Sequence, residues 1–527
     1  MMIYRSPYPD VDIPTVSLHA YLFEHAATYG DKAALIDGPT GRTITYGQLA
    51  ISVRRTALGL ADRGFGKGDV FAIYSPNIPE YAIAFFSVAA AGGVNTTVNP
   101  LYTADELHRQ LVGAHAKFLV TIPQFLDKAI AAAENTFIEE IFVFGTAEGA
   151  TPFATIAVET DRPITVDIAP HTDLVALPYS SGTTGLPKGV MLTHHNLVAN
   201  LCQTHRVEQL SQDEVVIGIL PFYHIYGMVV IMSGALRVGA TIVTMPRFDL
   251  EQFLGLLQTH EVTTAYLVPP IVLALAKHPL VDDYDISKLS NVMSGAAPLP
   301  EPVATACVER HDMVLRQGYG LTETSPVTHA NSRDREIRLA SVGFALPNTE
   351  YRVVDLTSGT DVEPTQLGEV WIRGPQVMKG YLNNLEATRE MIDADGWLHS
   401  GDIGYADQDG YLFVVDRVKE LIKYKGMQVA PAELEGVIQA HPSVADVAVI
   451  PVPDPEAGEI PKAFVVLKPG LQASSDTIME HVAARVAPHK KVRQVEFIDV
   501  IPKVPSGKIL RRELRDRDKA AREQGRA

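Results

Sequence analysis

The order of apolar and polar positions along the chain predicts alternating helices and strands. Amphipathic stretches with helical spacing cover residues 17–29, 45–60 and 80–91, and Thr103-Ala-Asp-Glu106 has the form of a capping box at a further helix start. Short apolar runs typical of strands occur at residues 70–74, 92–98, 116–121, 213–221, 240–245, 263–268 and 291–294. This alternation indicates a layered α/β architecture of sheets and helices.

The pattern changes near Arg417. Roughly a hundred residues follow, with an expected helix over 431–440 and strand-like runs at 444–452, 463–468 and 493–500. We therefore place a domain boundary near Arg417, between a large N-terminal α/β domain and a small C-terminal α+β domain.

The stretch Tyr179-Ser-Ser-Gly-Thr-Thr-Gly-Leu-Pro-Lys188-Gly joins two apolar runs and is rich in small residues. Glycines allow close backbone approach, and N–H groups, hydroxyls and one ammonium are donors for phosphate oxygens. The spacing is not that of a Walker A loop, and a flexible surface hairpin is the alternative interpretation. The phosphate-binding candidates are Ser180, Ser181, Gly182, Thr183, Thr184, Gly185 and Lys188.

Composition narrows the class of protein. Of 527 residues, 46% are hydrophobic and 20% are charged, which is typical of a globular chain. The net charge of −17 argues against nucleic acid as a partner. The two cysteines suggest neither a disulfide framework nor a cysteine zinc site. Because the sequence has neither a signal-peptide pattern nor an apolar run long enough to span a bilayer, we expect a cytoplasmic protein.

The small-residue stretch resembles the phosphate-binding loop of the adenylate-forming superfamily, which includes acyl-CoA and aryl-CoA ligases, firefly luciferase and peptide-synthetase adenylation domains. Similar motifs extend from about Ile44 to Arg512, with a likeness to the 4-coumarate–CoA ligase-like branch. The resemblance implies ATP, Mg²⁺ and coenzyme A as ligands. It also implies an N-terminal adenylation domain over 1–416, a hinge at 417–419 and a mobile lid over 420–527.

Gln317-Gly-Tyr-Gly-Leu-Thr-Glu323 resembles the adenine and magnesium segment of that superfamily. The resemblance places Gln317, Gly318 and Tyr319 at the nucleotide, with Tyr319 stacked on adenine. It places Thr322 at the α-phosphate and makes Glu323 a Mg²⁺ ligand, consistent with the preference of Mg²⁺ for oxygen.

By the same resemblance, Asp402 and Arg417 bind the ribose, because one carboxylate can accept hydrogen bonds from both ribose hydroxyls. A plain glycine-rich turn is the alternative interpretation both of the segment around Asp402 and of Gln317–Glu323.

Two lysine-bearing segments near the C-terminus resemble the parts of the lid that act in turn. In Pro505-Ser-Gly-Lys508 the lysine would bridge the substrate carboxylate and the α-phosphate, although turn lysines are otherwise common on protein surfaces. The other segment, Glu420–Gln428, resembles the face that forms the thioester, with solvated strand lysines as the alternative. The resemblance makes Lys423 and Gln428 catalytic, places Lys425 and Gly426 along coenzyme A, and puts Lys419 at the hinge, where it also contacts substrate.

Pro221-Phe-Tyr-His224-Ile-Tyr226-Gly resembles the ligase motif in which the histidine orients the substrate carboxylate. A packed core histidine is the alternative. Tyr226, Met293, Ala296 and Gly320 would line the acyl pocket; acetate-specific relatives have Trp at the position of Gly320. The lining has no carboxylate for an amino group, which argues against an amino-acid substrate.

These motifs predict an ATP-dependent acid–CoA ligase that activates an apolar carboxylate as acyl-AMP. A hydroxycinnamate-like acid and a medium- or long-chain fatty acid both fit, because apolar fit discriminates by only about 1–3 kcal/mol per methylene. The alternatives are a fatty acyl-AMP ligase that loads a carrier protein, a luciferase-like monooxygenase and an inactive nucleotide-binding regulator.

Overall fold

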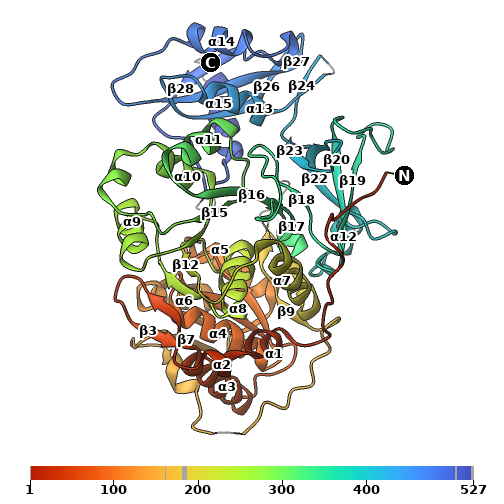
Figure 1. The fold of residues 1–527 in the computed structure, drawn as a ribbon. Coiled ribbons are helices and arrows are strands. Elements are labelled where there is room, and N and C mark those ends of the chain that lie inside the picture. The colour runs from red at the N-terminus through yellow and green to blue at the C-terminus, as the bar shows by residue number, and fades with distance from the viewer. Residues whose placement is uncertain (1, 161, 181–186, 426, 505–506, 524–527) are drawn as a thin grey trace.

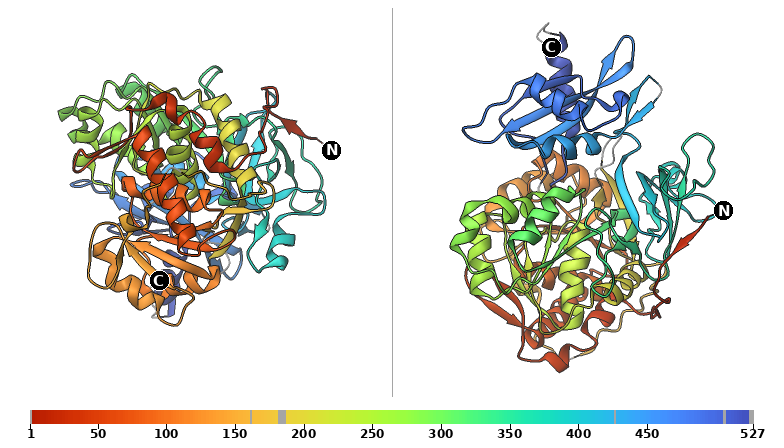
Figure 2. Two further views of the ribbon diagram at one scale, coloured as in Figure 1. Left: turned by 90° about the horizontal axis from the view of Figure 1, so that it is seen from below. Right: turned by 45° about the horizontal axis from the view of Figure 1, so that its top comes forward.

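The computed structural model describes residues 2–160, 162–180, 187–425, 427–504 and 507–523. Three sheets and the helices around them form the larger, N-terminal part, and a fourth sheet with its own helices lies above it (Figures 1 and 2). The mixed α/β architecture predicted from the sequence is confirmed. Among the described residues, no helix has both the length and the apolar character needed to cross a membrane.

The first nine-stranded sheet has a parallel centre. Its strands are β4 (Val70–Tyr74), β5 (Val94–Thr97), β6 (Ala116–Thr121), β7 (Glu140–Val143), β8 (Thr151–Pro152), β9 (Leu174–Ala176), β10 (Tyr179–Ser180), β11 (Lys188–Thr193) and β21 (Gly380–Tyr381). Strands β4, β5, β6 and β7 run parallel and are largely buried, as their apolar runs predict. The stretch predicted to bind phosphate begins in β10, and the residues after Leu186 continue into β11.

The second nine-stranded sheet carries most of the site. Its strands are β2 (Ala33–Asp37), β3 (Thr43–Thr45), β12 (Val215–Gly218), β13 (Thr241–Thr244), β14 (Thr264–Leu267), β15 (Asn291–Ser294), β16 (Val314–Gly320), β17 (Val327–Ala330) and β18 (Phe344–Ala345). Strands β12, β14, β15 and β16 are parallel neighbours. Their carboxyl ends therefore meet at one edge, which is where open α/β sheets bind ligands.

Helices cover and join these two sheets. They are α1 (Leu18–Phe23), α2 (Ala26–Tyr29), α3 (Tyr46–Asp62), α4 (Pro79–Ala90), α5 (Ala104–Ala114), α6 (Leu126–Ala133), α7 (His194–Glu208), α8 (Gly234–Val238), α9 (Leu250–Thr259), α10 (Pro269–Lys277), α11 (Glu301–Arg310) and α12 (Leu385–Met391). The predicted capping box at Thr103 is present at the start of α5. The single helix expected over 17–29 is wrong, because α1 ends at Phe23 and α2 starts afresh at Ala26.

A five-stranded antiparallel sheet connects the N-terminal part to the C-terminal segment. It contains β1 (Tyr4–Arg5), β19 (Glu350–Val354), β20 (Gly368–Arg373), β22 (Leu398–Ala406) and β23 (Leu412–Arg417). The register of β22 and β23 sets Asp402 directly opposite Arg417, fifteen residues away in sequence. The chain leaves this sheet at Arg417.

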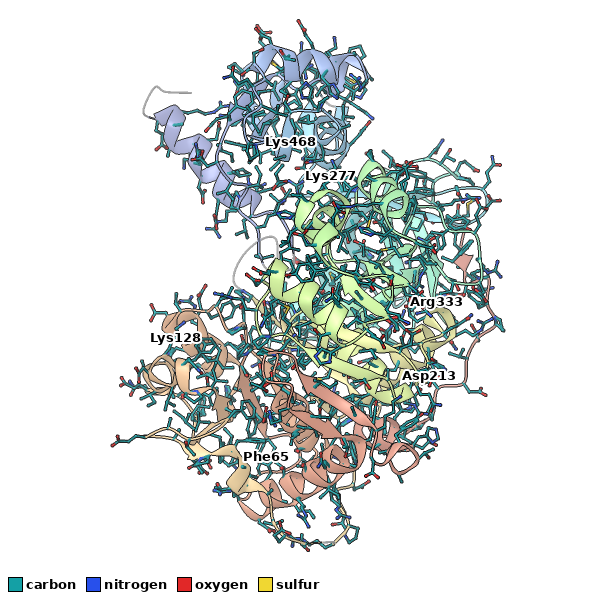
Figure 3. All side chains as sticks on the ribbon, turned by 60° about the vertical axis from the view of Figure 1, so that its left-hand side comes forward. Phe65, Lys128, Asp213, Lys277, Arg333 and Lys468 are labelled. Atoms are coloured by element: carbon teal, nitrogen blue, oxygen red, sulfur yellow. The ribbon has the colours of Figure 1, made fainter. Side chains whose placement is uncertain are left out.

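The C-terminal segment has its own sheet and two hydrophobic clusters of its own. Its elements are β24 (Ile422–Tyr424), β25 (Met427–Val429), α13 (Pro431–Gln439), β26 (Val444–Asp454), β27 (Gly458–Leu467), α14 (Ser475–Ala483), β28 (Gln494–Phe497) and α15 (Arg511–Glu523). Figure 3 shows Lys468 of this segment facing Lys277 at the end of α10. The two line a small cavity of about 170 Å³, where burial and then the charge of Lys468 lower the pKa of Lys277.

Candidate active site

A cleft with a volume of about 1360 Å³ lies where the sheets and the C-terminal segment meet. Most of the predicted site residues line it. They are Ser180, Lys188, His224, Tyr226, Met293, Ala296, Gly318, Tyr319, Gly320, Thr322, Glu323, Arg417, Lys419 and Lys508. Ser181, Gly182, Thr183, Thr184, Gly185 and Gly426 lie outside the described residues, as does the side chain of Gln428.

One end of the cleft is built around the carboxylate of Asp402. The Tyr319 hydroxyl donates to it at 2.6 Å, and the Arg417 Nε lies 2.9 Å from its other oxygen. Asp402 is almost fully buried, whereas Arg417 is partly exposed toward the cleft. These contacts hold the phenol and the guanidinium together at one wall, although the sequence separates them by almost a hundred residues.

Glu323 lies deeper in the same region. Its Oε1 accepts hydrogen bonds from the hydroxyls of Ser180, at 3.0 Å, and Tyr381, at 2.8 Å. Lys188 lies over the Tyr381 ring, with 4.9 Å between Nζ and the ring centroid. The carboxylate, the hydroxyls and this ammonium thus converge on one space, a donor set that suits phosphate oxygens and a cation bound to them.

Lys508 enters the cleft from the C-terminal segment. The preceding Gly507 has φ +80°, and a Cβ there would lie 2.9 Å from Cδ of Pro270 at the start of α10, so only glycine fits this contact. Burial, and then the nearby Arg417 guanidinium, lower the pKa of Lys508 to about 8. The turn thereby brings a compact cation to the middle of the cleft.

His224 faces the same space from the body. Burial, and then the positive charge of Lys508, lower its pKa to about 4, so the ring is neutral at pH 7. Its Nδ1 accepts the Tyr226 backbone N–H at 3.3 Å. Because a neutral imidazole carries one proton, that proton is on Nε2, which can donate to a ligand.

The other end of the cleft contains the residues predicted to line an acyl pocket. Tyr226 begins the π-helix η3 (Tyr226–Ser233), a geometry common at functional sites, and its hydroxyl donates to the Met293 carbonyl at 3.2 Å. Ala296 has φ +67°, which is strained for a residue with a side chain. Position 320 has room only for glycine, because a Cβ there would lie 2.0 Å from the Pro326 carbonyl oxygen.

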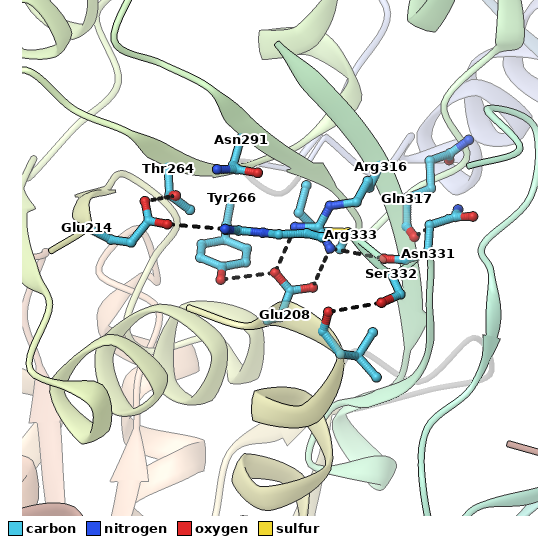
Figure 4. Close-up of polar contacts among 12 residues, drawn as sticks. Glu208, Glu214, Thr264, Tyr266, Asn291, Arg316, Gln317, Asn331, Ser332 and Arg333 are labelled. Atoms are coloured by element: carbon cyan, nitrogen blue, oxygen red, sulfur yellow. Dashed lines mark hydrogen bonds and ion pairs between the residues drawn. The ribbon is translucent and has the colours of Figure 1, made fainter. Parts of the chain in front are cut away.

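Three polar residues that the sequence did not single out are joined beside this part of the cleft. Arg316 forms two hydrogen bonds to the carboxylate of Glu208, at 3.1 and 3.0 Å, and the Tyr266 hydroxyl contacts the same carboxylate at 3.3 Å (Figure 4). Glu208 and Tyr266 line the cleft. The available signal was an arginine inside the apolar run that leads into Gln317, since a charge buried in a strand needs a partner.

Some predicted residues lie away from the cleft lining. Gln317 is buried, accepts the Leu299 N–H at 3.2 Å and donates to the Leu339 carbonyl, so it holds backbone in place. Lys423 and Lys425 are exposed on and beside β24, outside the cleft. Lys425 has φ +47°, at the turn between β24 and β25.

Comparisons with known proteins agree with this geometry. Residues 22–382 match the family model described as AMP-binding enzyme, and residues 433–508 match the AMP-binding enzyme C-terminal domain. The chain is 43% identical over 526 residues to 4-coumarate–CoA ligase 1 of Petroselinum crispum, an alignment that covers 98% of this chain and 97% of the relative.

Solved structures of related enzymes superpose on most of the chain. ATP-bound MatB from Rhodopseudomonas palustris matches with a TM-score of 0.87 at 30% identity, over 95% of this chain and 99% of that one. The anthranilate CoA ligase AuaEII in complex with anthranoyl-AMP matches with a TM-score of 0.88 at 25% identity, over 97% and 99%.

Proposed function

The chain belongs to the AMP-binding enzyme family, and we propose that it joins a planar aromatic acid of the hydroxycinnamate kind to coenzyme A. Its reaction class is that of an ATP-dependent acid–CoA ligase, which forms acyl-AMP and then the thioester. The proposal rests on one observation: Lys508 and His224 line the same cleft, between the end around Asp402, which suits a nucleotide, and the apolar pocket around Tyr226.

The first step joins two anions, the carboxylate and ATP, so the site must offset their repulsion and align them. Lys508 supplies a point charge where the carboxylate oxygen would approach the α-phosphorus. The Nε2–H of His224 donates to the other carboxylate oxygen and fixes its direction. Lys188 and the hydroxyl of Ser180 contact the departing phosphates.

The nucleoside is held at the wall around Asp402. Its carboxylate, kept in place by Tyr319 and Arg417, accepts from the ribose hydroxyls, while the Tyr319 ring faces the adenine. Glu323 fits a Mg²⁺ ion that arrives with ATP, because Mg²⁺ is commonly bound by one or two carboxylates together with substrate phosphates. Bound there, the ion supplies charge neutralisation at the phosphates.

The second step needs a different arrangement of the C-terminal segment. Lys508 lines the cleft in this structure, whereas Lys423 and Lys425 lie outside it. Rotation about residues 417–419 would remove Lys508 and present the Lys423–Gln428 face to coenzyme A. Thus one small domain serves both half-reactions.

The choice of an aromatic acid rests on the pocket and on the named relatives. Tyr226 and Tyr266 meet edge to face, with 6.3 Å between ring centroids, and provide flat apolar walls. Beyond them lie the buried Arg316 and Glu208, whose charged groups suit the end of an alkyl chain poorly.

The test is pyrophosphate release over a panel of cinnamates, benzoates and fatty acids, followed by addition of coenzyme A. We expect release with cinnamates above all, and a CoA thioester as product. No release with any aromatic acid, or an acyl-AMP that never passes to coenzyme A, would contradict the proposal.

A further inference from the structure

We propose that Glu208, held by Arg316, is a specificity-determining residue that accepts a hydrogen bond from a neutral donor group, such as a phenolic hydroxyl, at the far end of the acid. This inference rests on the proposed function and names the group by which the pocket would select its substrate. The relevant side chains are drawn together in Figure 4.

The carboxylate lies at the interior end of the acyl pocket. Glu208 is the last residue of α7, and its side chain keeps 9% of its surface exposed, whereas that of Arg316 keeps 1%. Glu208 lines the cleft with Tyr226, Tyr266 and Val230. The Glu208 side chain therefore borders the pocket, whereas Arg316 is outside the cleft lining.

Fold stability does not account for the charged pair. Removing two charges from water is costly, and replacing a buried ion pair by well-packed apolar side chains is often neutral or stabilising. An apolar end would also suit an apolar acid better, because burying a polar group without a partner is unfavourable. A retained carboxylate at this position is explained if a ligand donates to it.

The carboxylate has room for one more donor. Two oxygens offer about four lone-pair positions. The contacts among described residues use three of them: Arg316 Nη1 and Nη2, and the Tyr266 hydroxyl at 3.3 Å. The remaining position is available to a group entering from the pocket.

The charges decide which group fits. Arg316 offsets the charge of Glu208, so the pair offers little attraction to a second cation, and a carboxylate at the far end of the acid would meet a carboxylate. A neutral hydroxyl donates without adding charge. A chain that ends in a methyl group displaces water from Glu208 and forms no hydrogen bond in its place, which makes binding less favourable.

The experiment compares kcat/KM for three acids that differ only at the far end: 4-coumarate, cinnamate and 4-methoxycinnamate, which has no donor there. We expect the wild-type enzyme to prefer 4-coumarate over both by roughly 10- to 150-fold, the range for a hydrogen bond to a charged group. The paired variant Glu208→Leu/Arg316→Met should lose this preference, with kcat/KM for 4-coumarate falling relative to kcat/KM for cinnamate.

A second, partly buried ion pair provides a control. Arg333 Nη1 lies 3.2 Å from Glu214, and neither residue lines the cleft (Figure 4). Glu214→Leu/Arg333→Met should leave the preference unchanged. The single variant Glu208→Gln keeps the shape and one acceptor oxygen, so it reports on the proposal if the paired variant does not fold; we expect it to lower the preference by roughly tenfold.

A preference that survives in both Glu208 variants, or equal wild-type activity with 4-coumarate and cinnamate, would overturn the inference and leave the ligase activity standing. Absence of pyrophosphate release with all three acids would instead overturn the proposed function, and this inference with it.

Discussion

The two ends of the cleft differ in how their charged groups are partnered. At the nucleotide end Arg417 is paired with Asp402, but no carboxylate in the described part of the chain forms a salt bridge with Lys188 or Lys508. At the acyl end, Glu208 and Arg316 are already bound to each other. A lysine without a carboxylate partner can pair with an anionic ligand. The charges of Glu208 and Arg316 offset each other, so this pair affects only which acids can bind beside it.

The ends also differ in where their residues come from. The nucleotide end combines β10, β16, β22 and the turn before Lys508, which belong to different sheets and to the C-terminal segment. The groups that close the acyl end sit on α7, β14 and β16 within the body. Substitutions at the nucleotide end should therefore change the rate of adenylation or the KM for ATP, and substitutions at the acyl end should change which acid is used.

Lys508→Ala should have the largest effect. Loss of a single preorganised charge-stabilising group costs about 100- to 1000-fold, so we expect acid-dependent pyrophosphate release to fall at least about 100-fold. The conversion of supplied acyl-AMP and coenzyme A to thioester should remain near the wild-type rate, because the proposed role of Lys508 is confined to the first step.

Lys423→Ala is the matched control, since this lysine belongs to the same segment and is exposed outside the cleft. It should slow thioester formation more than adenylation. Equal losses in both half-reactions for either variant would contradict the division of work between the two lysines.

Asp402→Asn should have the next largest effect. Tyr319 and Arg417 both contact this carboxylate, and loss of a hydrogen bond to a charged group corresponds to roughly 10- to 150-fold. We expect the KM for ATP to rise in that range while the KM for the acid stays constant. Steady-state kinetics with each substrate varied in turn would measure this, and an equal rise for the acid would contradict the assignment of Asp402 to the nucleotide.

The pH dependence of adenylation should follow Lys508. Burial and the Arg417 charge lower the pKa of Lys508 to about 8, so its ammonium is present below that pH and is lost above it. The kcat/KM for ATP, which reports on the free enzyme, should fall about tenfold per unit above pH 8. Lys508→Arg keeps the charge over this range and should flatten the profile; a wild-type rate that stays constant to pH 10 would exclude Lys508 as the titrating group.

Local patterns were sufficient to predict much of the fold. The apolar runs at 70–74, 116–121 and 291–294 correspond to β4, β6 and β15, because each strand buries a short apolar stretch in a sheet. The break between α1 and α2 was missed, since residues 17–29 have one continuous amphipathic pattern and the chain reversal depends on tertiary packing.

The cleft lining was predicted where its residues form contiguous motifs, as in residues 318–323. It was missed where function depends on contacts between distant segments. Glu208 ends a helix, and Arg316 lies 108 positions later in a strand. Nothing local marks Glu208, and Tyr381 likewise gains its importance only from its contact with Glu323. Such pairings are set by the order of strands in a sheet, which spacing along the chain does not reveal.

The smallest expected effect concerns a contact between the N-terminal part and the C-terminal segment. Asp416, the residue before Arg417 in β23, accepts the Ala432 N–H at the start of α13 at 2.8 Å, and thus contacts the C-terminal segment from the body. A contact of this capping kind is worth about 0.5–2 kcal/mol. Asp416→Ala should therefore depopulate the arrangement with Lys508 in the cleft and lower adenylation by roughly 2- to 30-fold.

Asp416 would change the population of the arrangement with Lys508 in the cleft and would not contact a ligand. In Asp416→Ala, kcat/KM for ATP and kcat/KM for the acid should therefore fall by the same factor, in contrast to Asp402→Asn. Asp446→Ala is the control, as Asp446 pairs with Lys503 at 2.6 Å wholly inside the C-terminal segment; both kcat/KM values should stay at wild type. A loss confined to one substrate in Asp416→Ala would show that Asp416 belongs to a binding site and not to the contact that positions the segment.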